Sequence, residues 1–150
     1  MAHNSLRIAA NSKRMVSFVI DDMVVSLLLL AIFWTPIEKI IADAPSFGVM
    51  AATIIVFVTQ NILVVFGVKI IYHTVPVWQS GMTVGKYAMR IKTVDEESAA
   101  LPTLMQALGR ALTRVVSEMT FYIGFVFAFY SPLHQTLHDK LSSCVVVNAD

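Results

Sequence analysis

The chain has 150 residues, of which 57% are hydrophobic and 14% charged, and its mean hydropathy is +0.71. Soluble domains carry about 25% charged residues, so this composition predicts a membrane protein. The formal net charge of +1 is too small for a nucleic-acid-binding surface, and one cysteine, Cys144, excludes an intramolecular disulfide and a thiolate zinc site.

Two stretches are long and apolar enough to cross a membrane as helices. Such a helix needs about 20 mostly apolar residues, because each residue adds about 1.5 Å along the axis. Residues 15–34 meet this length and are followed by Pro36, and residues 48–72 meet it and end at the aromatic Tyr72. Residues 1–14 are polar and unlike a signal peptide, so we expect the first stretch to stay in the protein.

The distribution of basic residues predicts the orientation. Cytoplasmic segments of membrane proteins are enriched in lysine and arginine. Basic residues precede the first stretch and follow the second, whereas the connection at 35–47 has mixed charge: Arg7, Lys13, Arg14, Lys69, Lys86, Arg90 and Lys92 against Glu38, Lys39 and Asp43. We therefore expect a cytoplasmic amino terminus and an external 35–47 loop.

After the second stretch the chain becomes more polar, and residues 75–101 are expected to form a cytoplasmic segment. Within it, residues 89–94 alternate between apolar and polar side chains, which is typical of a strand. Residues 144–147 are a second run with three β-branched valines. Because a lone strand is unstable, we expect the two runs to pair in a small cytoplasmic ladder.

Residues 103–133 form a third membrane element with two possible topologies. Its most apolar piece, 119–130, is short for a full crossing. If the element crosses once, the run at 144–147 emerges outside; if both strands are cytoplasmic, the element enters and returns. The predicted fold is thus an all-α membrane protein forming one domain over 1–150, with two spanning helices, a third short or re-entrant element, a small cytoplasmic β-pair and a tail at 134–150.

Ionisable residues inside the first apolar stretch are the main functional signal. Asp21 and Asp22 lie at a depth where an unpaired carboxylate is costly. Arg14, seven residues before Asp21, lies on nearly the same helix face. Because Asp22 points in another direction, at least one of the two acids is expected to bind a partner from another helix.

The expected partners are basic residues of the third element. Arg110, Arg114 and Glu118 follow one another at four-residue intervals and therefore share a helix face. A third polar stripe, on the second apolar stretch, includes Thr53, Gln60 and Asn61. We expect these stripes to face Asp21 and Asp22.

Two functions fit such a network. Intramembrane acids and arginines can serve only to fix helix packing, which would suit an accessory or assembly subunit of a membrane complex. Alternatively, Asp21 and Asp22 bind a monovalent cation or a proton, and Arg14, Arg110 and Arg114 adjust the charge of the site. The second alternative, a cation/proton exchanger or related transport component, is our preferred interpretation.

Other motifs indicate neither an enzyme nor a metal or cofactor site. His134 and His138 are four residues apart, but no third ligand is evident, so a surface or capping role is expected. The Gly-rich piece at 81–86 lacks the spacing of a phosphate-binding loop and is expected to be a turn before an interfacial helix. No nucleophile with a matching base is present, so no enzymatic activity is expected.

Several motifs in the same order resemble the RDD family of small bacterial membrane proteins, named for one arginine and two aspartates. Arg14 and Asp21 match the first helix, and Gly81-Met82-Thr83-Val84-Gly85-Lys86 matches the family's Gly-x-Thr-x-Gly-Lys turn. The arginine pair resembles Arg110 and Arg114, and residues 135–141 match the closing Gln-Thr-Leu-His-Asp-Lys-Leu motif. The second family aspartate is either Asp22 or Asp139, and we favour Asp139, which is expected to cap a helix or bind Arg90, Arg110 or Lys86.

The resemblance implies a multi-pass protein of the bacterial inner membrane, with transport as its suggested role. It does not supply a substrate. Because two or three helices enclose no pathway, we expect a homo-oligomer or a partner membrane protein, with membrane lipid and a monovalent cation or proton as further partners and no nucleic acid.

Overall fold

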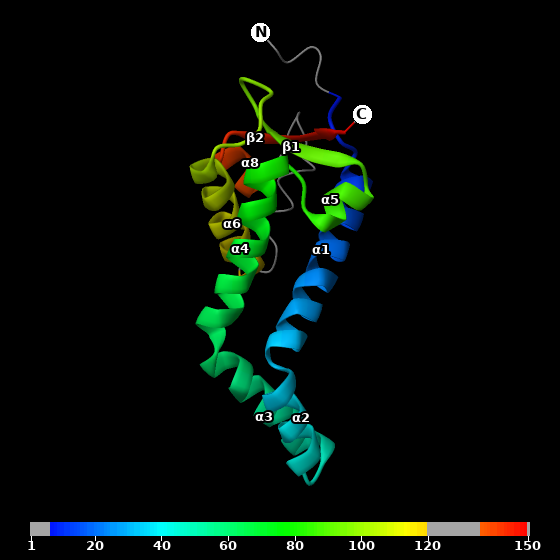
Figure 1. Ribbon diagram of the computed structural model, residues 1–150, viewed down its shortest axis with the longest axis vertical. Coiled ribbons are helices and arrows are strands. Elements are labelled where there is room, and N and C mark those ends of the chain that lie inside the picture. The colour runs from blue at the N-terminus through cyan, green and yellow to red at the C-terminus, as the bar shows by residue number, and fades with distance from the viewer. Residues whose placement is uncertain (1–6, 120–135, 150) are drawn as a thin grey trace.

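A computed structural model describes residues 7–119 and 136–149, except for the side chains of residues 137 and 138. The molecule is elongated, with both described chain ends beside a small sheet at one end and two short helices at the other (Figure 1). The elements are α1 (Asn11–Ile32), α2 (Trp34–Asp43), α3 (Phe47–Gln60), α4 (Ile62–Ser80), α5 (Val84–Ala88), β1 (Ile91–Asp95), α6 (Leu104–Met119), α8 (Leu137–Leu141) and β2 (Cys144–Asn148).

Helix α1 corresponds to the first predicted apolar stretch, but it begins earlier than residue 15. Hydropathy marks only the apolar part of the helix, whereas the helix itself includes the polar residues Lys13 and Arg14, whose side chains have partners at the sheet end. Two described helices, α1 and α4, are long and apolar enough to cross a membrane.

The second predicted stretch, 48–72, is not one helix. It is divided at Asn61 into α3 and α4, and Asn61 has φ −103° and ψ 21°, outside the helical region. The Asn61 amide donates to the Phe57 carbonyl oxygen at 2.8 Å, and such local bonding by asparagine competes with a regular helix. Helix α4 then continues to Ser80, so the expected polar segment 75–101 begins inside a helix.

The expected loop at 35–47 is largely the helix α2, which corrects that prediction. Pro36 is the third residue of α2. The first N–H groups of a helix have no acceptor within the helix, so the missing N–H of proline costs no hydrogen bond there. Phe33, the residue between α1 and α2, contacts α3 through Phe57. The two rings meet edge to face, with centroids 5.2 Å apart.

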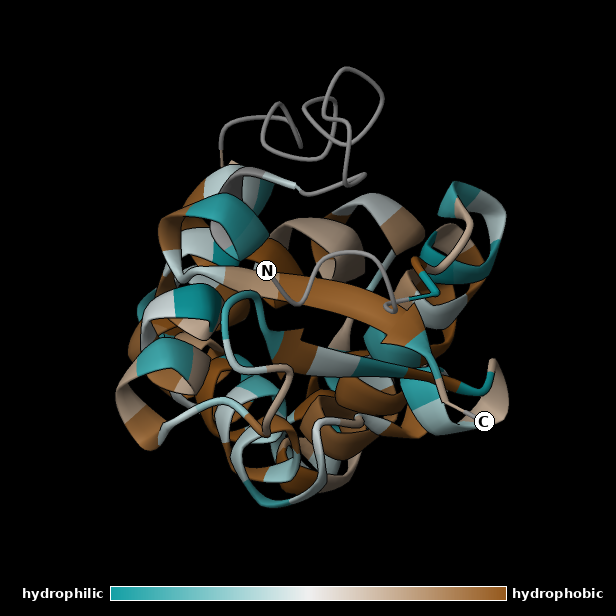
Figure 2. Ribbon diagram, turned by 90° about the horizontal axis from the view of Figure 1, so that it is seen from above, coloured by the Kyte–Doolittle hydropathy of each residue, from teal (hydrophilic) through white to brown (hydrophobic). Residues whose placement is uncertain are grey.

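The predicted pairing of the two strand-like runs is confirmed. Strands β1 and β2 are antiparallel, with Ile91 opposite Asn148 and Asp95 opposite Cys144. Ile8 adds a bridge to Val147, which brings the start of the described chain to the same sheet. Viewed from above in Figure 2, the strongly apolar β2 crosses the end of the molecule, and its residues Cys144 to Val147 are buried.

The re-entrant alternative for the third element assumed that both strands lie on the same side, and β1 and β2 do pair. Helices α6 and α8 also pack against each other, at the sheet end. Residues 120–135, which include most of the predicted apolar piece, lie outside the described residues.

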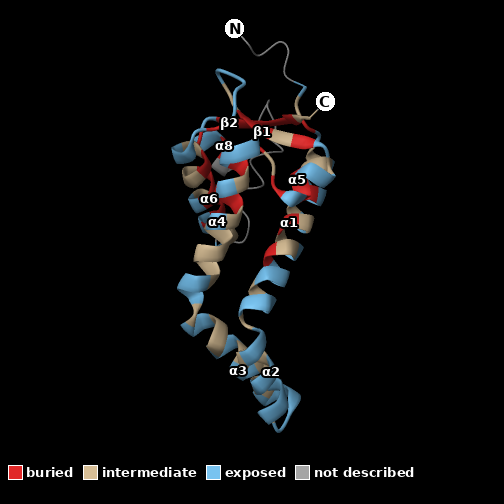
Figure 3. Ribbon diagram, viewed as in Figure 1, coloured by how far each residue is buried: buried red, intermediate tan, exposed pale blue. Residues whose placement is uncertain are grey.

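The buried residues gather at the sheet end, while α2 and α3 are mostly exposed (Figure 3). Many exposed side chains on the long helices are apolar; Leu27 is 63% exposed, Leu63 82% and Ile71 64%. An apolar surface of this extent is not typical of a soluble monomer, but it suits contact with lipid.

Candidate functional site: a buried charge network at the sheet end

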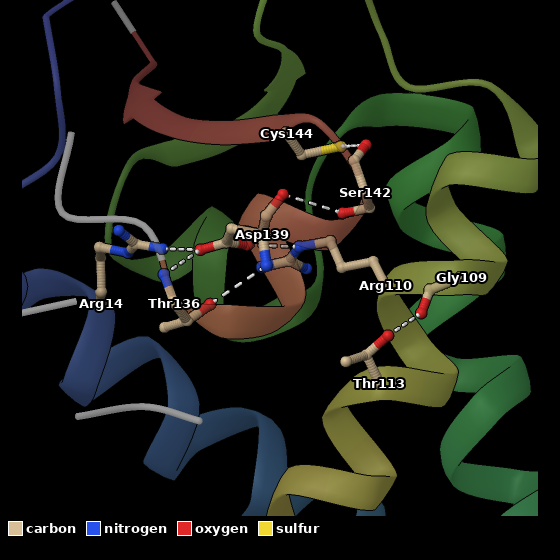
Figure 4. Close-up of polar contacts among 8 residues, drawn as sticks. All are labelled: Arg14, Gly109, Arg110, Thr113, Thr136, Asp139, Ser142 and Cys144. Carbon is tan, nitrogen blue, oxygen red and sulfur yellow. Dashed lines mark hydrogen bonds and ion pairs between the residues drawn. The ribbon is translucent and has the colours of Figure 1, made fainter. Parts of the chain in front are cut away.

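Asp139, near the end of the described chain, lies between two arginines from different helices. Arg110 of α6 donates through Nε to Asp139 Oδ1 at 2.7 Å, and Arg14 of α1 donates through Nη2 to Oδ2 (Figure 4). The Asp139 side chain is fully buried, and the two arginine side chains are 5% and 11% exposed. One carboxylate therefore joins α1, α6 and α8.

The same carboxylate caps helix α8. The Thr136 N–H donates to Asp139 Oδ2 at 3.2 Å, and the Asp139 N–H donates to Thr136 Oγ1 at 3.4 Å, which together form a capping box. Of the expectations for Asp139, the helix cap and the bond to Arg110 are confirmed, whereas the side chains of Arg90 and Lys86 make no bond to it among the described residues. The cap and the two arginines thus share one carboxylate.

Asp21 is also buried, with 1% exposure, but its partners are neutral. Its carboxylate accepts hydrogen bonds from Tyr72 Oη at 2.8 Å, Thr83 Oγ1 at 2.6 Å and the Gly85 N–H at 2.8 Å. Within the described part of the chain, Asp21 makes no ion pair. The carboxylate therefore connects α1 to α4 and to the start of α5 through hydrogen bonds, and no cationic side chain among the described residues balances its charge.

Gly85 allows this close approach. A β-carbon at position 85 would collide with the Ser17 carbonyl oxygen and lie 2.9 Å from the Asp21 carboxyl carbon. Gly81, with φ +74°, ends α4 in the left-handed conformation and turns the chain toward α5. The Gly-rich piece is therefore a turn into a short helix, as expected, and its two glycines serve different geometric needs.

A second ion-pair group lies along α6. Arg114 donates through Nε to Glu118 Oε1 at 3.1 Å, and Lys69 Nζ donates to Glu118 Oε2 at 2.7 Å. The Arg114 guanidinium also lies over the Phe18 ring, 4.5 Å from its centroid. The predicted common face of Arg110, Arg114 and Glu118 is confirmed, because all three side chains point into the buried network.

The expected partnership between the α1 acids and the α6 arginines is wrong for the described contacts. Helix α5 and its preceding turn pack on α1 and occupy the space around Asp21, while α6 packs on α4 and α8. Asp22 is 44% exposed, and its nearest cation is Lys69 at 3.9 Å. The arginines Arg110 and Arg114 bind Asp139 and Glu118 instead.

The polar stripe expected on the second stretch is not part of the network. Thr53 and Gln60 are exposed, and Thr53 donates to the Val49 carbonyl oxygen of its own helix. Asn61 likewise donates within its own chain segment, to Phe57. The break at Asn61 separates these residues from the sheet end, so the prediction that they face Asp21 is wrong.

Sequence reasoning missed Tyr72, Thr83 and Gly85 as partners of Asp21, and it considered Lys86 only as a partner of Asp139. The signal was present in the Gly-x-Thr-x-Gly-Lys turn, since Thr83 and Gly85 both bind Asp21. Tyr72 carried no separate signal, because an aromatic residue near a helix end equally indicates a membrane interface.

Lys86 is the most unusual member, because its side chain is buried and makes no hydrogen bond or ion pair with the described residues. Burial lowers the pKa of Lys86 well below its usual value, and the positive charge of Arg110 lowers this pKa further. The charges of Asp139 and Asp21 act in the opposite direction.

Replacement of Lys86 by methionine is expected to remove part of the pH dependence of stability. Between the lowered folded pKa and the unfolded value of 10.5, the unfolded chain binds more protons than the folded chain, so wild-type stability rises with pH. The contribution reaches at most about 1.4 kcal/mol per pH unit for one group. Unfolding of wild type and Lys86→Met in detergent at several pH values checks this; equal slopes would contradict it.

Cys144 is buried, and its Sγ donates to the Ser142 carbonyl oxygen at 3.3 Å (Figure 4). Burial raises the pKa of this thiol, which keeps it in the unreactive protonated form. No group of three or more metal-ligating side chains occurs among the described residues, and His134 and the His138 side chain lie outside them.

These features define a small helical membrane protein with a buried charge network at one end of its bundle. The chain belongs to the RDD family, whose sequence pattern matches residues 8–143 and thus includes the whole described network. It is also 34% identical over 96 residues to the uncharacterized protein RP437 of Rickettsia prowazekii (strain Madrid E). The match covers 64% of this chain and 50% of that protein, so the chain spans about half the length of this relative. No solved structure matches.

Proposed function

We propose that this protein is a membrane transport component that exchanges a monovalent cation for protons, with Asp21 as the binding group. The observation that carries the proposal is the setting of Asp21, a carboxylate buried in an apolar helix and paired with no described cation. Two hydroxyl oxygens, from Tyr72 and Thr83, lie 2.8 and 2.6 Å from it. Carboxylate and hydroxyl oxygens are suitable ligands for a hard cation, and the carboxylate alternatively takes a proton.

Asp139 supports this choice by contrast. Its charge is balanced by Arg14 and Arg110, so it has no need of a further cation. In the proposal Arg14 and Arg110 have a structural role, because they join α1, α6 and α8. The Arg114–Glu118 pair is structural too, because Lys69 of α4 binds Glu118 of α6. Asp22, half-exposed beside Lys69, assists by attracting the cation toward Asp21.

The Asp21→Asn variant is expected to lose exchange while still folding. Asparagine keeps the shape of the side chain but cannot carry the charge that a proton or cation neutralises. Purified protein is reconstituted into vesicles that contain a pH-sensitive dye, and a Na⁺ or K⁺ gradient is applied. In the wild type, cations flowing down their gradient should drive protons across the membrane in the opposite direction, and the dye should report this. Asp21→Asn should give only the signal of protein-free vesicles.

The matched control is Asp43→Asn, which removes an equal charge from the exposed end of α2 and should exchange like the wild type. Circular dichroism of each variant in detergent confirms that the fold is kept. Equal flux in wild type and Asp21→Asn would refute the role of Asp21. A folded wild type that gives no flux would favour the alternative below.

The proposal also includes a location and an assembly. The sheet end carries Arg7, Lys13 and Arg90, so it is assigned to the cytoplasmic side of a bacterial inner membrane, together with the amino terminus. Two spanning helices enclose no pathway, so exchange requires a homo-oligomer or a partner membrane protein. Reporter fusions at residue 1 test the first point, and light scattering of the purified protein tests the second.

The alternative is an accessory or assembly subunit, and one observation favours it. Three neutral donors already bind Asp21 and fasten α4 and the α5 turn to α1, which is also what a purely structural group would do. In that case Asp21→Asn would alter stability, and no variant would alter flux.

A further inference from the structure

An open cavity of about 620 Å³ lies at the sheet end, beside the start of α1. It is lined by Arg7, Lys13, Arg90, Asn148 and Ala149. Three of these five residues are basic, and none is acidic. The cavity is therefore a concentrated positive surface outside the charge network described above.

The end of β2 holds all three basic residues in place. The Asn148 N–H donates to the Arg7 carbonyl oxygen at 2.8 Å, and the Ala149 N–H donates to the Arg90 carbonyl oxygen at 2.9 Å. Lys13 Nζ donates to Asn148 Oδ1 at 3.0 Å. The backbones of the three basic residues are thus brought together by the fold itself, and the Lys13 ammonium is already held at the cavity, which lowers the entropic cost of binding an anion there.

Arg90 supports a binding role for this cavity. It occupies the turn between α5 and β1 with φ +53°, a conformation that glycine or asparagine adopts more easily. Its exposed side chain makes no hydrogen bond or ion pair with the described residues. A long basic side chain kept at a strained position points to a use for its charge.

The position of the cavity along α1 indicates which anion it meets. Met15 and Val16, immediately after the first turn of α1, are 60% and 46% exposed and begin the apolar outer surface of this helix. Lys13 is only two residues earlier, a rise of about 3 Å. The cavity therefore lies where the apolar surface gives way to polar residues, which is the level of lipid headgroups.

We propose that this cavity binds the phosphate group of an anionic membrane lipid. Arginine offers paired donors to phosphate oxygens, and lysine adds a point charge. The inference requires that α1 spans the membrane, but it does not depend on cation exchange, so its binding test can fail or succeed independently of the flux test.

The test measures lipid binding to the purified full chain in detergent by native mass spectrometry. Phosphatidylglycerol is the anionic probe, and phosphatidylcholine is the neutral one. The wild type should bind phosphatidylglycerol more tightly than phosphatidylcholine. Each cation removed should weaken phosphatidylglycerol binding about fivefold, so the double variant Lys13→Gln with Arg90→Gln should weaken it about 25-fold. The control, Lys39→Gln with Lys140→Gln, removes two exposed lysines elsewhere and should bind as the wild type does.

Three results would overturn the proposal. The first is equal binding of the two lipids by the wild type, and the second is equal weakening in the test and control variants. The third is binding of inorganic phosphate as tight as that of the lipid, which would assign the cavity to a free anion. If the double variant does not fold, Arg90→Gln alone is used, because its side chain is exposed, and about fivefold weakening is expected.

Discussion

Asp139→Ala is expected to lower the free energy of unfolding by about 3–5 kcal/mol, because it leaves buried arginines without their counter-ion. Arg110 would lose its 2.7 Å bond, Arg14 would lose its ion pair, and α8 would lose its cap. The cap alone is worth about 1 kcal/mol. Equilibrium unfolding in detergent micelles, followed by circular dichroism, measures the difference.

Two further variants separate the charge of Asp139 from its cap. Asp139→Asn retains an oxygen acceptor for the Thr136 N–H but no negative charge, so it should recover little of the loss. Asp43→Ala, on the exposed face of α2, should change stability by less than about 0.5 kcal/mol. If Asp139→Ala costs no more than Asp43→Ala, the two arginines do not depend on this carboxylate.

Gly85→Ala is expected to destabilise the protein by about 3–5 kcal/mol. The new β-carbon collides with the Ser17 carbonyl oxygen, which belongs to the backbone of α1 and cannot rotate away. Separation of α5 from α1 then weakens the 2.8 Å bond from Gly85 to Asp21. Overpacking costs about 1–3 kcal/mol, and a hydrogen bond to a charged group is worth about 1.5–3 kcal/mol.

Gly109→Ala is the matched control for this prediction. Gly109 lies in α6, and a β-carbon there would meet no atom within 4 Å. Alanine should therefore stabilise the helix by about 0.5–1 kcal/mol. The same unfolding measurement applies to both variants. Similar stabilities for Gly85→Ala and Gly109→Ala would show that α1 and α5 have room to move apart.

Some tertiary contacts could be predicted because the chain alone constrained them. The runs at 89–94 and 144–147 each needed a strand partner, and each was the other's best match in the sequence, so their pairing was foreseeable. The cap at Asp139 was foreseeable for a similar reason, because the threonine three residues before it forms a local motif that does not depend on the rest of the fold.

The choice of partner within the charge network was not foreseeable. Charge complementarity matched Asp21 equally well to Arg110 or Arg114, but its carboxylate instead accepts hydrogen bonds from Tyr72, Thr83 and Gly85. The break at Asn61 was not predicted either, because hydropathy averaged over residues 48–72 does not register a change of helix direction, although Gln60 and Asn61 interrupt the apolar run. Both outcomes depend on backbone positions that are remote in sequence.

The sequence by itself determined the membrane class, the family, the first apolar helix and the strand pair, because these follow from composition, periodicity and motif order over short ranges. Only the tertiary structure decided that Asp139 binds Arg14 together with Arg110, whereas Asp21 binds neutral donors. It also decided that three basic residues share one cavity: Arg7, Lys13 and Arg90. The physical reason is that hydrogen bonds and ion pairs act over a few ångströms. Their partners are therefore fixed by packing between distant segments, such as α1 with α5, and not by the spacing of residues along the chain.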